Sequence, residues 1–207
     1  MLIVFVGIPG SGKSSLVKKL AGRLNAKYFT EPEEEKWADA AKDWKNYGSF
    51  SMLMWFRSIR VPMLLEAKKL SEEGEVVLID TYYDKLLHYY LDKYCLRWLI
   101  SPSDLYFEPM KKIAEIDNKV LPDANMIIFL EVNYQNWLEN LKNRGRETDQ
   151  SEEFQKNFET QKFLYEATQK YCAEKGVELI SLARDNSSFS ELADQLTKIL
   201  ESKINKN

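Results

Sequence analysis

The sequence predicts an α/β fold, a three-layer sandwich in which a five-stranded parallel sheet carries helices on both faces. Two observations lead to this prediction. Short runs rich in β-branched and aromatic residues alternate along the chain with longer segments of helical periodicity. The first run, residues 2–6, is apolar without interruption, which is typical of a strand buried on both faces of a parallel sheet. Because helical crossovers connect parallel strands, the alternation predicts helices on both sides of the sheet.

The first 80 residues contain three of the predicted strands. After the first strand and a glycine-rich turn, leucines recur every four residues, which predicts a helix. A long helical segment later ends at Gly74, a residue that commonly terminates helices. The segments predicted after the turn are a helix at 14–24, a strand at 27–30, an acidic loop at 31–36, a helix at 49–73 and a strand at 76–79.

The remaining residues add two strands and most of the helices. Asn133 is a favourable N-cap, Gly176 stops a helix, and Ser188 with Glu191 forms a capping box for the last helix. The predicted segments are helices at 82–98 and 103–117, a strand at 126–130, a helix at 134–141, a polar stretch at 143–150, a helix at 151–175, a strand at 177–182 and a final helix with a frayed tail after 202.

Length and composition narrow the class of protein. A chain of 207 residues without a linker or repeat suits a single domain over 1–207. The net charge of −3 argues against a nucleic-acid partner, and no apolar run approaches the ~20 residues that span a membrane. One histidine rules against a His-based zinc site, and two cysteines without a Cys-x-x-Cys spacing indicate reduced thiols in a cytoplasmic protein.

Residues 7–14 read Gly-Ile-Pro-Gly-Ser-Gly-Lys-Ser and match the phosphate-binding (Walker A) pattern G-x-x-x-x-G-K-[ST] in full. Glycines let backbone N–H groups turn inward around phosphates, and the following helix adds its positive N-terminal end. Lys13 has the reach for the β and γ phosphates, and the Ser14 hydroxyl suits Mg²⁺. The nucleotide-binding residues predicted here are Gly7, Pro9, Gly10, Ser11, Gly12, Lys13, Ser14 and Ser15.

Two further patterns decide against a GTPase. Asp80, at the end of the third strand, is followed by Thr-Tyr-Tyr, so the D-x-x-G signature of GTPases is absent. Residues 118–121 read Asn-Lys-Val-Leu, so the guanine-reading N-K-x-D signature also fails. Asp80 itself lies at a strand end beside the predicted phosphate loop, where a carboxylate can hold Mg²⁺ together with Ser14. A helix N-cap is the alternative role for Asp80.

Several segments in sequence order resemble the thymidylate kinase and deoxyribonucleoside kinase group of P-loop kinases. They are the phosphate loop, Thr-Glu-Pro at 30–32 followed by Trp37, Asp-Thr-Tyr at 80–82 with Tyr89, Pro-Asp at 122–123, and the Arg-rich segment at about 143–150. The resemblance implies a P-loop kinase that uses ATP and Mg²⁺ and acts on a small-molecule nucleoside or nucleotide. It also implies that residues 143–150 form a lid.

The resemblance assigns further roles in the site. Glu31 is expected beside the acceptor oxygen, and it acts as base in members that phosphorylate nucleosides. Trp37 and Tyr82 are expected to line the base pocket. Arg144 and Arg146 are expected to close over the transferring phosphoryl group. Arg57 and Arg60 share one helix face, and either of them matches an arginine that contacts substrate.

The sequence departs from the family at Thr81, where thymidylate kinases carry an arginine. Arg57 or Arg60 could substitute for that charge, the acceptor could differ, or the protein could bind nucleotide without turnover. Thymidylate or a related deoxynucleotide is the first choice of acceptor, and phosphorylation of a deoxynucleoside 5′-hydroxyl is the alternative. A kinase acting on a nucleic-acid end or on another small molecule remains a third interpretation. A homodimer also stays open, because these families are often dimeric.

Overall fold

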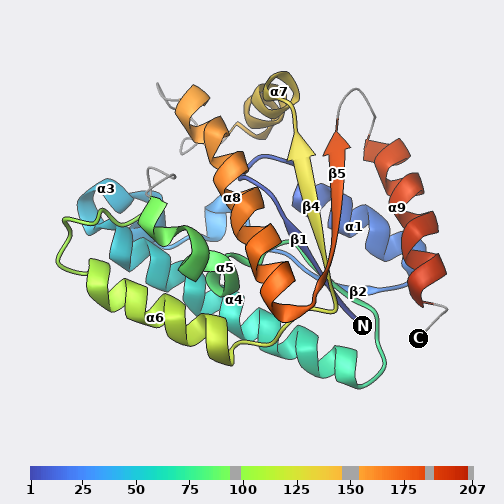
Figure 1. The fold of residues 1–207 in the computed structure, drawn as a ribbon. Coiled ribbons are helices and arrows are strands. Elements are labelled where there is room, and N and C mark those ends of the chain that lie inside the picture. Colours follow the sequence, from blue (N-terminus) through green and yellow to red (C-terminus); the bar gives the residue numbers. More distant parts are fainter. Residues whose placement is uncertain (94–98, 146–153, 185–188, 205–207) are drawn as a thin grey trace.

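The computed structural model describes residues 1–93, 99–145, 154–184 and 189–204. Within these residues, five parallel strands form one sheet in the order β2-β3-β1-β4-β5 (Figure 1). The predicted fold class is therefore confirmed. The strands are β1 (Leu2–Val6), β2 (Lys27–Phe29), β3 (Val77–Ile79), β4 (Met126–Val132) and β5 (Glu178–Arg184).

Helices surround the sheet and connect its strands. Among them, α7 is capped as predicted, because the Asn133 side chain accepts a hydrogen bond from the Asn136 amide at 2.8 Å. The helices are α1 (Lys13–Leu24), α2 (Asp39–Lys42), α3 (Trp44–Tyr47), α4 (Ser49–Glu72), α5 (Tyr83–Tyr90), α6 (Phe107–Val120), α7 (Tyr134–Arg144), α8 (Phe154–Lys175) and α9 (Phe189–Ile204), with short 3₁₀ turns at Glu34–Lys36 and Leu91–Lys93.

Two predicted helices have wrong bounds, and one helical stretch was missed. Helix α5 ends at Tyr90 rather than near 98, and residues 94–98 lie outside the described part of the chain. The helix predicted from 103 begins at Phe107, because Asp104 accepts from the Tyr106 amide at 2.8 Å and from the Phe107 amide at 3.0 Å and so favours a turn there. Short helices at 39–47 were not predicted.

The ends of two other helices also differ from the predictions. Helix α7 continues into the polar stretch and ends at Arg144, followed by Gly145 with φ of +64°. Helix α9 continues to Ile204, past the predicted start of fraying. The capping box at Ser188 lies outside the described residues, as does most of the predicted lid.

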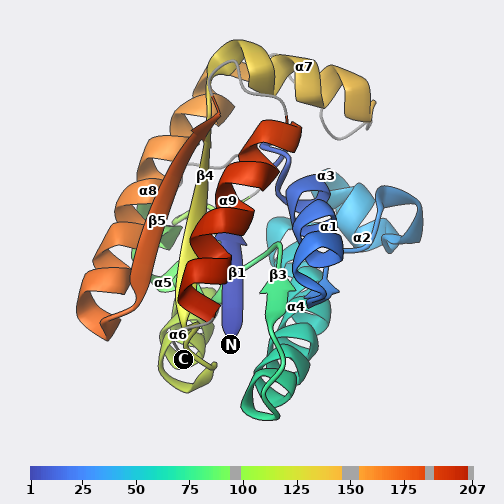
Figure 2. The same cartoon turned by 90° about the vertical axis from the view of Figure 1, so that its right-hand side faces the viewer.

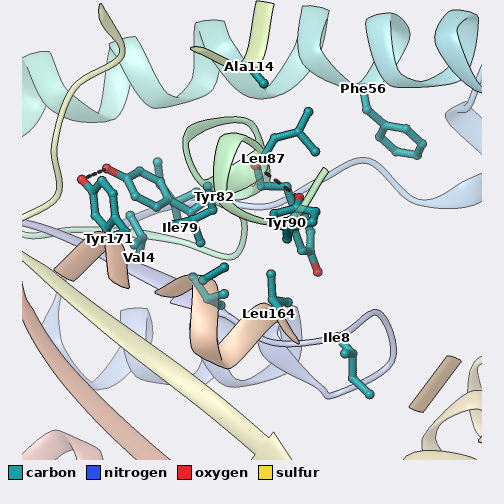
Figure 3. Close-up of a cluster of buried hydrophobic side chains, with 14 of the residues drawn as sticks. Val4, Ile8, Phe56, Ile79, Tyr82, Leu87, Tyr90, Ala114, Leu164 and Tyr171 are labelled. Atoms are coloured by element: carbon teal, nitrogen blue, oxygen red, sulfur yellow. Dashed lines mark hydrogen bonds between the residues drawn. The ribbon is translucent and has the colours of Figure 1, made fainter. Parts of the chain in front are cut away.

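The buried strand β1 separates two layers of the core. Val4 and Val6 face α4, α5 and α8, whereas Ile3 and Phe5 face α1 and α9 (Figure 2). This alternation follows from the period of two along a strand. Figure 3 shows part of the larger layer, where residues from the sheet, α4, α5, α6 and α8 pack together.

The loops at the carboxyl ends of the strands form the functional edge of the sheet. The phosphate loop connects β1 to α1, and α7 lies beyond the tips of β4 and β5 (Figure 1). Ligands of open α/β sheets bind outside these strand ends, so the topology places the candidate site at this edge. Within the described residues, no helix has the length and apolar composition that a membrane span requires.

Candidate active site

The phosphate loop is held between α7 and the start of α1. The Trp137 indole donates to the Pro9 carbonyl at 2.8 Å, and the Asn140 amide donates to the Gly10 carbonyl at 2.8 Å. A Cβ on Gly10 would lie 2.5 Å from the Leu141 side chain, so this close packing requires a glycine. The side chains of α7 thus fix the conformation of the loop that the sequence pattern predicted.

Gly12 has a second steric requirement. Its φ is +94°, and an added Cβ would lie 2.3 Å from the ring of Phe189 on α9. We expect Gly12→Ala to weaken ATP binding at least about tenfold, because left-handed strain of about 1–3 kcal/mol adds to displacement of the aromatic ring. The measurement is an ATP titration by calorimetry, with thermal unfolding alongside.

Gly22→Ala is the matched control for that substitution. Gly22 lies on an exposed side of α1, the helix that Gly12 precedes, and its added Cβ would meet no atom within 4 Å. We expect this variant to bind ATP normally and to be more stable by up to about 1 kcal/mol. Wild-type ATP affinity in Gly12→Ala would contradict the steric argument.

Lys13 is buried at the N-terminus of α1. Its ammonium donates to the Gly7 carbonyl at 2.9 Å and to the Ile8 carbonyl at 3.0 Å. Burial lowers the pKa of Lys13 to about 8, although the charges of Glu31 and Asp80 act in the opposite direction. Neighbouring groups therefore only partly offset the cost of burying the positive charge of Lys13. Bound phosphate oxygens would supply further negative charge beside it.

Ser14 and Asp80 meet as the sequence predicted for a Mg²⁺ site. The Ser14 hydroxyl donates to one Asp80 oxygen, and the Glu31 amide donates to the other at 3.1 Å. Burial, together with the charge of Glu31, raises the pKa of Asp80 to about 6. A hydroxyl and a carboxylate are oxygen ligands of the kind that Mg²⁺ prefers, so these side chains fit the ion.

Glu31 forms an ion pair with Arg60 from α4. The Arg60 Nε donates to Glu31 Oε1 at 2.6 Å. Burial would favour the neutral acid, but the charge and hydrogen bond of Arg60 together with the charge of Lys13 lower the pKa of Glu31. Glu31 is therefore a carboxylate at neutral pH.

The structure separates Arg57 and Arg60, which the sequence left as alternatives. Arg57 donates from Nε and from a terminal nitrogen to Asp117 on α6, at 2.6 and 2.7 Å. Arg60 and Glu31 both line a cavity that also includes the phosphate loop, whereas Arg57 does not line it. Of the two, only Arg60 is placed to contact a ligand in that cavity.

A cavity of about 520 Å³ joins these groups. Its lining includes the phosphate loop and Arg144, and also apolar and aromatic side chains from the segment 37–56. Trp37 donates to the Pro32 carbonyl at 2.9 Å, and its ring lies edge-on to Phe56 with centroids 5.0 Å apart. The cavity lining includes Lys13, Ser14, Glu31, Pro32, Trp37, Ala41, Trp44, Met52, Phe56, Arg60, Asp80, Tyr83, Asn140, Arg144 and Phe189.

Comparison with known proteins agrees with this arrangement. Residues 2–185 match the family described as AAA domain. The chain belongs to this AAA domain family. This AAA domain is also 27% identical over 157 residues to the probable thymidylate kinase of Methanococcus vannielii, a match that covers 74% of this chain and 72% of the relative.

Solved structures share the fold of this AAA domain. Deoxyadenosine kinase from M. mycoides with bound dATP superposes with a TM-score of 0.70 at 19% identity, covering 99% of this chain and all of that chain. Thymidylate kinase from Candida albicans gives a TM-score of 0.62 at 16% identity, covering 100% of this chain and 93% of that one. The predicted resemblance to the thymidylate kinase and deoxyribonucleoside kinase group is confirmed.

Tyr82 lies in the core of the AAA domain rather than along the cavity. Its hydroxyl donates to the Pro122 carbonyl at 2.9 Å, accepts from the Ala124 amide at 3.1 Å and bonds the Tyr171 hydroxyl (Figure 3). We expect Tyr82→Phe to lower the free energy of unfolding by about 1–3 kcal/mol, because buried partners lose a hydrogen bond. Chemical denaturation measures this, and a loss of ATP affinity at unchanged stability would contradict a core role.

Tyr83, the next residue, lines the cavity beside the phosphate loop, whereas Tyr82, which the sequence analysis placed in the base pocket, does not line it. Its hydroxyl donates to the Gly7 carbonyl at 2.7 Å, and burial strongly raises its pKa. The adjacent tyrosines differ only in the direction that α5 gives them, so sequence type alone could not choose between them. The sequence analysis did not identify Asn140 and Phe189, because they reach the phosphate loop from helices that are distant in sequence.

The two predicted lid arginines differ in what the structure describes. Arg144 is the last residue of α7 and lines the cavity. Arg146 lies outside the described residues, so its role stays a prediction.

Proposed function

We propose that this AAA domain transfers the γ-phosphoryl group of ATP to a nucleoside monophosphate or nucleoside, with thymidylate or a related deoxynucleotide as the first choice of acceptor. The cavity that joins the phosphate loop to the Glu31–Arg60 pair carries the proposal. The thymidylate kinase relative supports the same reaction class. Phosphoryl transfer requires chiefly that donor and acceptor be positioned and that charge be stabilised, and this cavity has groups for each purpose.

The donor end would hold ATP through the phosphate loop. Backbone amides at the start of α1 and the Lys13 ammonium would bind the β and γ phosphates. Ser14 and Asp80 would hold Mg²⁺, which when bound neutralises charge on the phosphates. Arg144, and Arg146 from the segment beyond it, would stabilise charge on the transferring group and exclude water.

The acceptor end would hold a nucleobase among aromatic side chains. Trp37 and Phe56 offer ring faces and edges, and the guanidinium of Arg60 lies 4.6 Å from the centroid of the Phe56 ring. An ionised Glu31 can accept a proton from a hydroxyl group. The ionised Glu31 favours a second candidate function, phosphorylation of a deoxynucleoside 5′-hydroxyl, in which a base removes the hydroxyl proton. A monophosphate oxygen is already ionised and needs no strong base.

The test is ADP release with ATP and Mg²⁺ against a panel of nucleosides and nucleoside monophosphates, with Lys13→Ala as the blank. We expect a signal that depends on one acceptor class. A signal with monophosphates supports the first candidate, and a signal with nucleosides supports the second. ATP binding without turnover on any acceptor would contradict both and favour a non-catalytic nucleotide-binding protein.

A further inference from the structure

Arg60 contacts Glu31 from the segment after β2, Phe56 from its own helix and two residues of α5. Its Nε donates to Glu31 at 2.6 Å, and a terminal nitrogen lies 3.8 Å from a carboxylate oxygen of Asp84 on α5. The guanidinium carbon also lies 4.6 Å from the ring centroid of Phe56 and 5.0 Å from that of Tyr83. An arginine side chain has many rotamers, so these contacts together select one orientation.

Asp84 contacts Arg60 but has no role in the proposed reaction. It is 7% exposed and is absent from the cavity lining, so it cannot touch a ligand there. Asp84 lies in the first turn of the helix α5, and its carboxylate faces a terminal nitrogen of Arg60. A buried carboxylate is costly unless it is paired, and Arg60 is the cation that the structure pairs with it.

The geometry points to Asp84 as a positioning residue for the acceptor. It holds the Arg60 guanidinium in the orientation that presents Nε to Glu31, and so keeps the pair aligned along the cavity. This inference rests on the proposed function. The hydrogen bond to Glu31 fixes one edge of the planar guanidinium, and the Asp84 carboxylate attracts a terminal nitrogen from 3.8 Å. The remaining N–H groups therefore keep one direction only while both carboxylates stay in place.

The neighbouring Arg57–Asp117 pair provides the matched comparison. It also links an arginine of α4 to a buried aspartate, and Asp117 is 1% exposed. Neither of its members lines the cavity. A substitution at Asp117 therefore reports the cost of breaking a buried ion pair between helices at a residue that does not line the cavity.

The experiment compares Asp84→Asn with Asp117→Asn in steady-state assays and thermal unfolding. We expect Asp84→Asn to raise the acceptor KM and lower kcat/KM for the acceptor about tenfold or more, with the KM for ATP within about twofold of wild type. Asp117→Asn should lower the melting temperature and leave both KM values unchanged. Equal effects of the two substitutions on acceptor kinetics would overturn the inference.

A double-mutant cycle with Arg60→Gln tests whether Asp84 acts through Arg60. Once Arg60 is replaced, Asp84→Asn should have no further effect on acceptor kcat/KM, whereas a purely structural role predicts that the losses multiply. If Asp84→Asn does not fold, Asp84→Glu keeps the charge but moves the carboxylate. A selective rise in acceptor KM is expected for that variant, and an unchanged KM overturns the inference.

These outcomes are separable from failure of the proposed function. If the wild-type protein phosphorylates no acceptor, the proposed function fails before any variant is compared. If the wild-type protein is active and Asp84→Asn keeps its acceptor kinetics, only the positioning role fails.

Discussion

Lys13→Ala is expected to reduce acceptor-dependent ADP release by about 10²–10³-fold or more while the protein stays folded. Loss of a single preorganised donor to developing charge has effects of this size. In this chain the effect should be large because Lys13 is buried and lies between the phosphate loop and two carboxylates, Glu31 and Asp80. Without the ammonium, the phosphate loop loses its buried cation, and the nearby carboxylates Glu31 and Asp80 disfavour phosphate more strongly.

The stability of the Lys13→Ala variant should change little. The ammonium is bonded to two backbone carbonyls, and its burial is unfavourable, so losing the contacts and losing the buried charge offset each other. Circular dichroism and thermal unfolding check the fold, and ADP release checks the reaction. Lys19→Ala, on an exposed face of the same helix, is the control with normal activity. A folded and active Lys13→Ala protein would contradict the mechanism.

Glu31→Gln is expected to separate the two acceptor classes. If the acceptor is a nucleoside, turnover should fall about 10²–10⁴-fold, which is the range for loss of a general base. If the acceptor is a monophosphate, the loss should be much smaller, because no hydroxyl proton has to be removed. The physical basis is the lowered pKa of Glu31, which keeps a carboxylate beside Arg60 at neutral pH.

The measurement for this second prediction is kcat with each acceptor that the wild-type protein uses. Glu35→Gln, an exposed residue of the same acidic run, should retain wild-type rates and controls for the loss of one negative charge. A nucleoside acceptor whose turnover is unchanged in Glu31→Gln would show that Glu31 is not the base.

The sequence by itself determined the strands, their parallel arrangement and the phosphate loop. Local rules suffice for these features. Residues 2–6 are uniformly apolar because β1 is buried on both faces, and the glycines at positions 10 and 12 stand where positive φ and close packing exclude any side chain. The family resemblance depends on the same local segments, so it too could be predicted without a structure.

Only the tertiary structure decided which of several equivalent residues enter the cavity. Arg57 and Arg60 are one helical turn apart on α4, and their different partners, Asp117 and Glu31, are distant in sequence. Tyr82 and Tyr83 are neighbours, yet one bonds Tyr171 in the core and the other bonds the phosphate loop. Phe189 reaches Gly12 from the far end of the chain. Side-chain direction and partners from remote segments make these choices, and no local pattern encodes them.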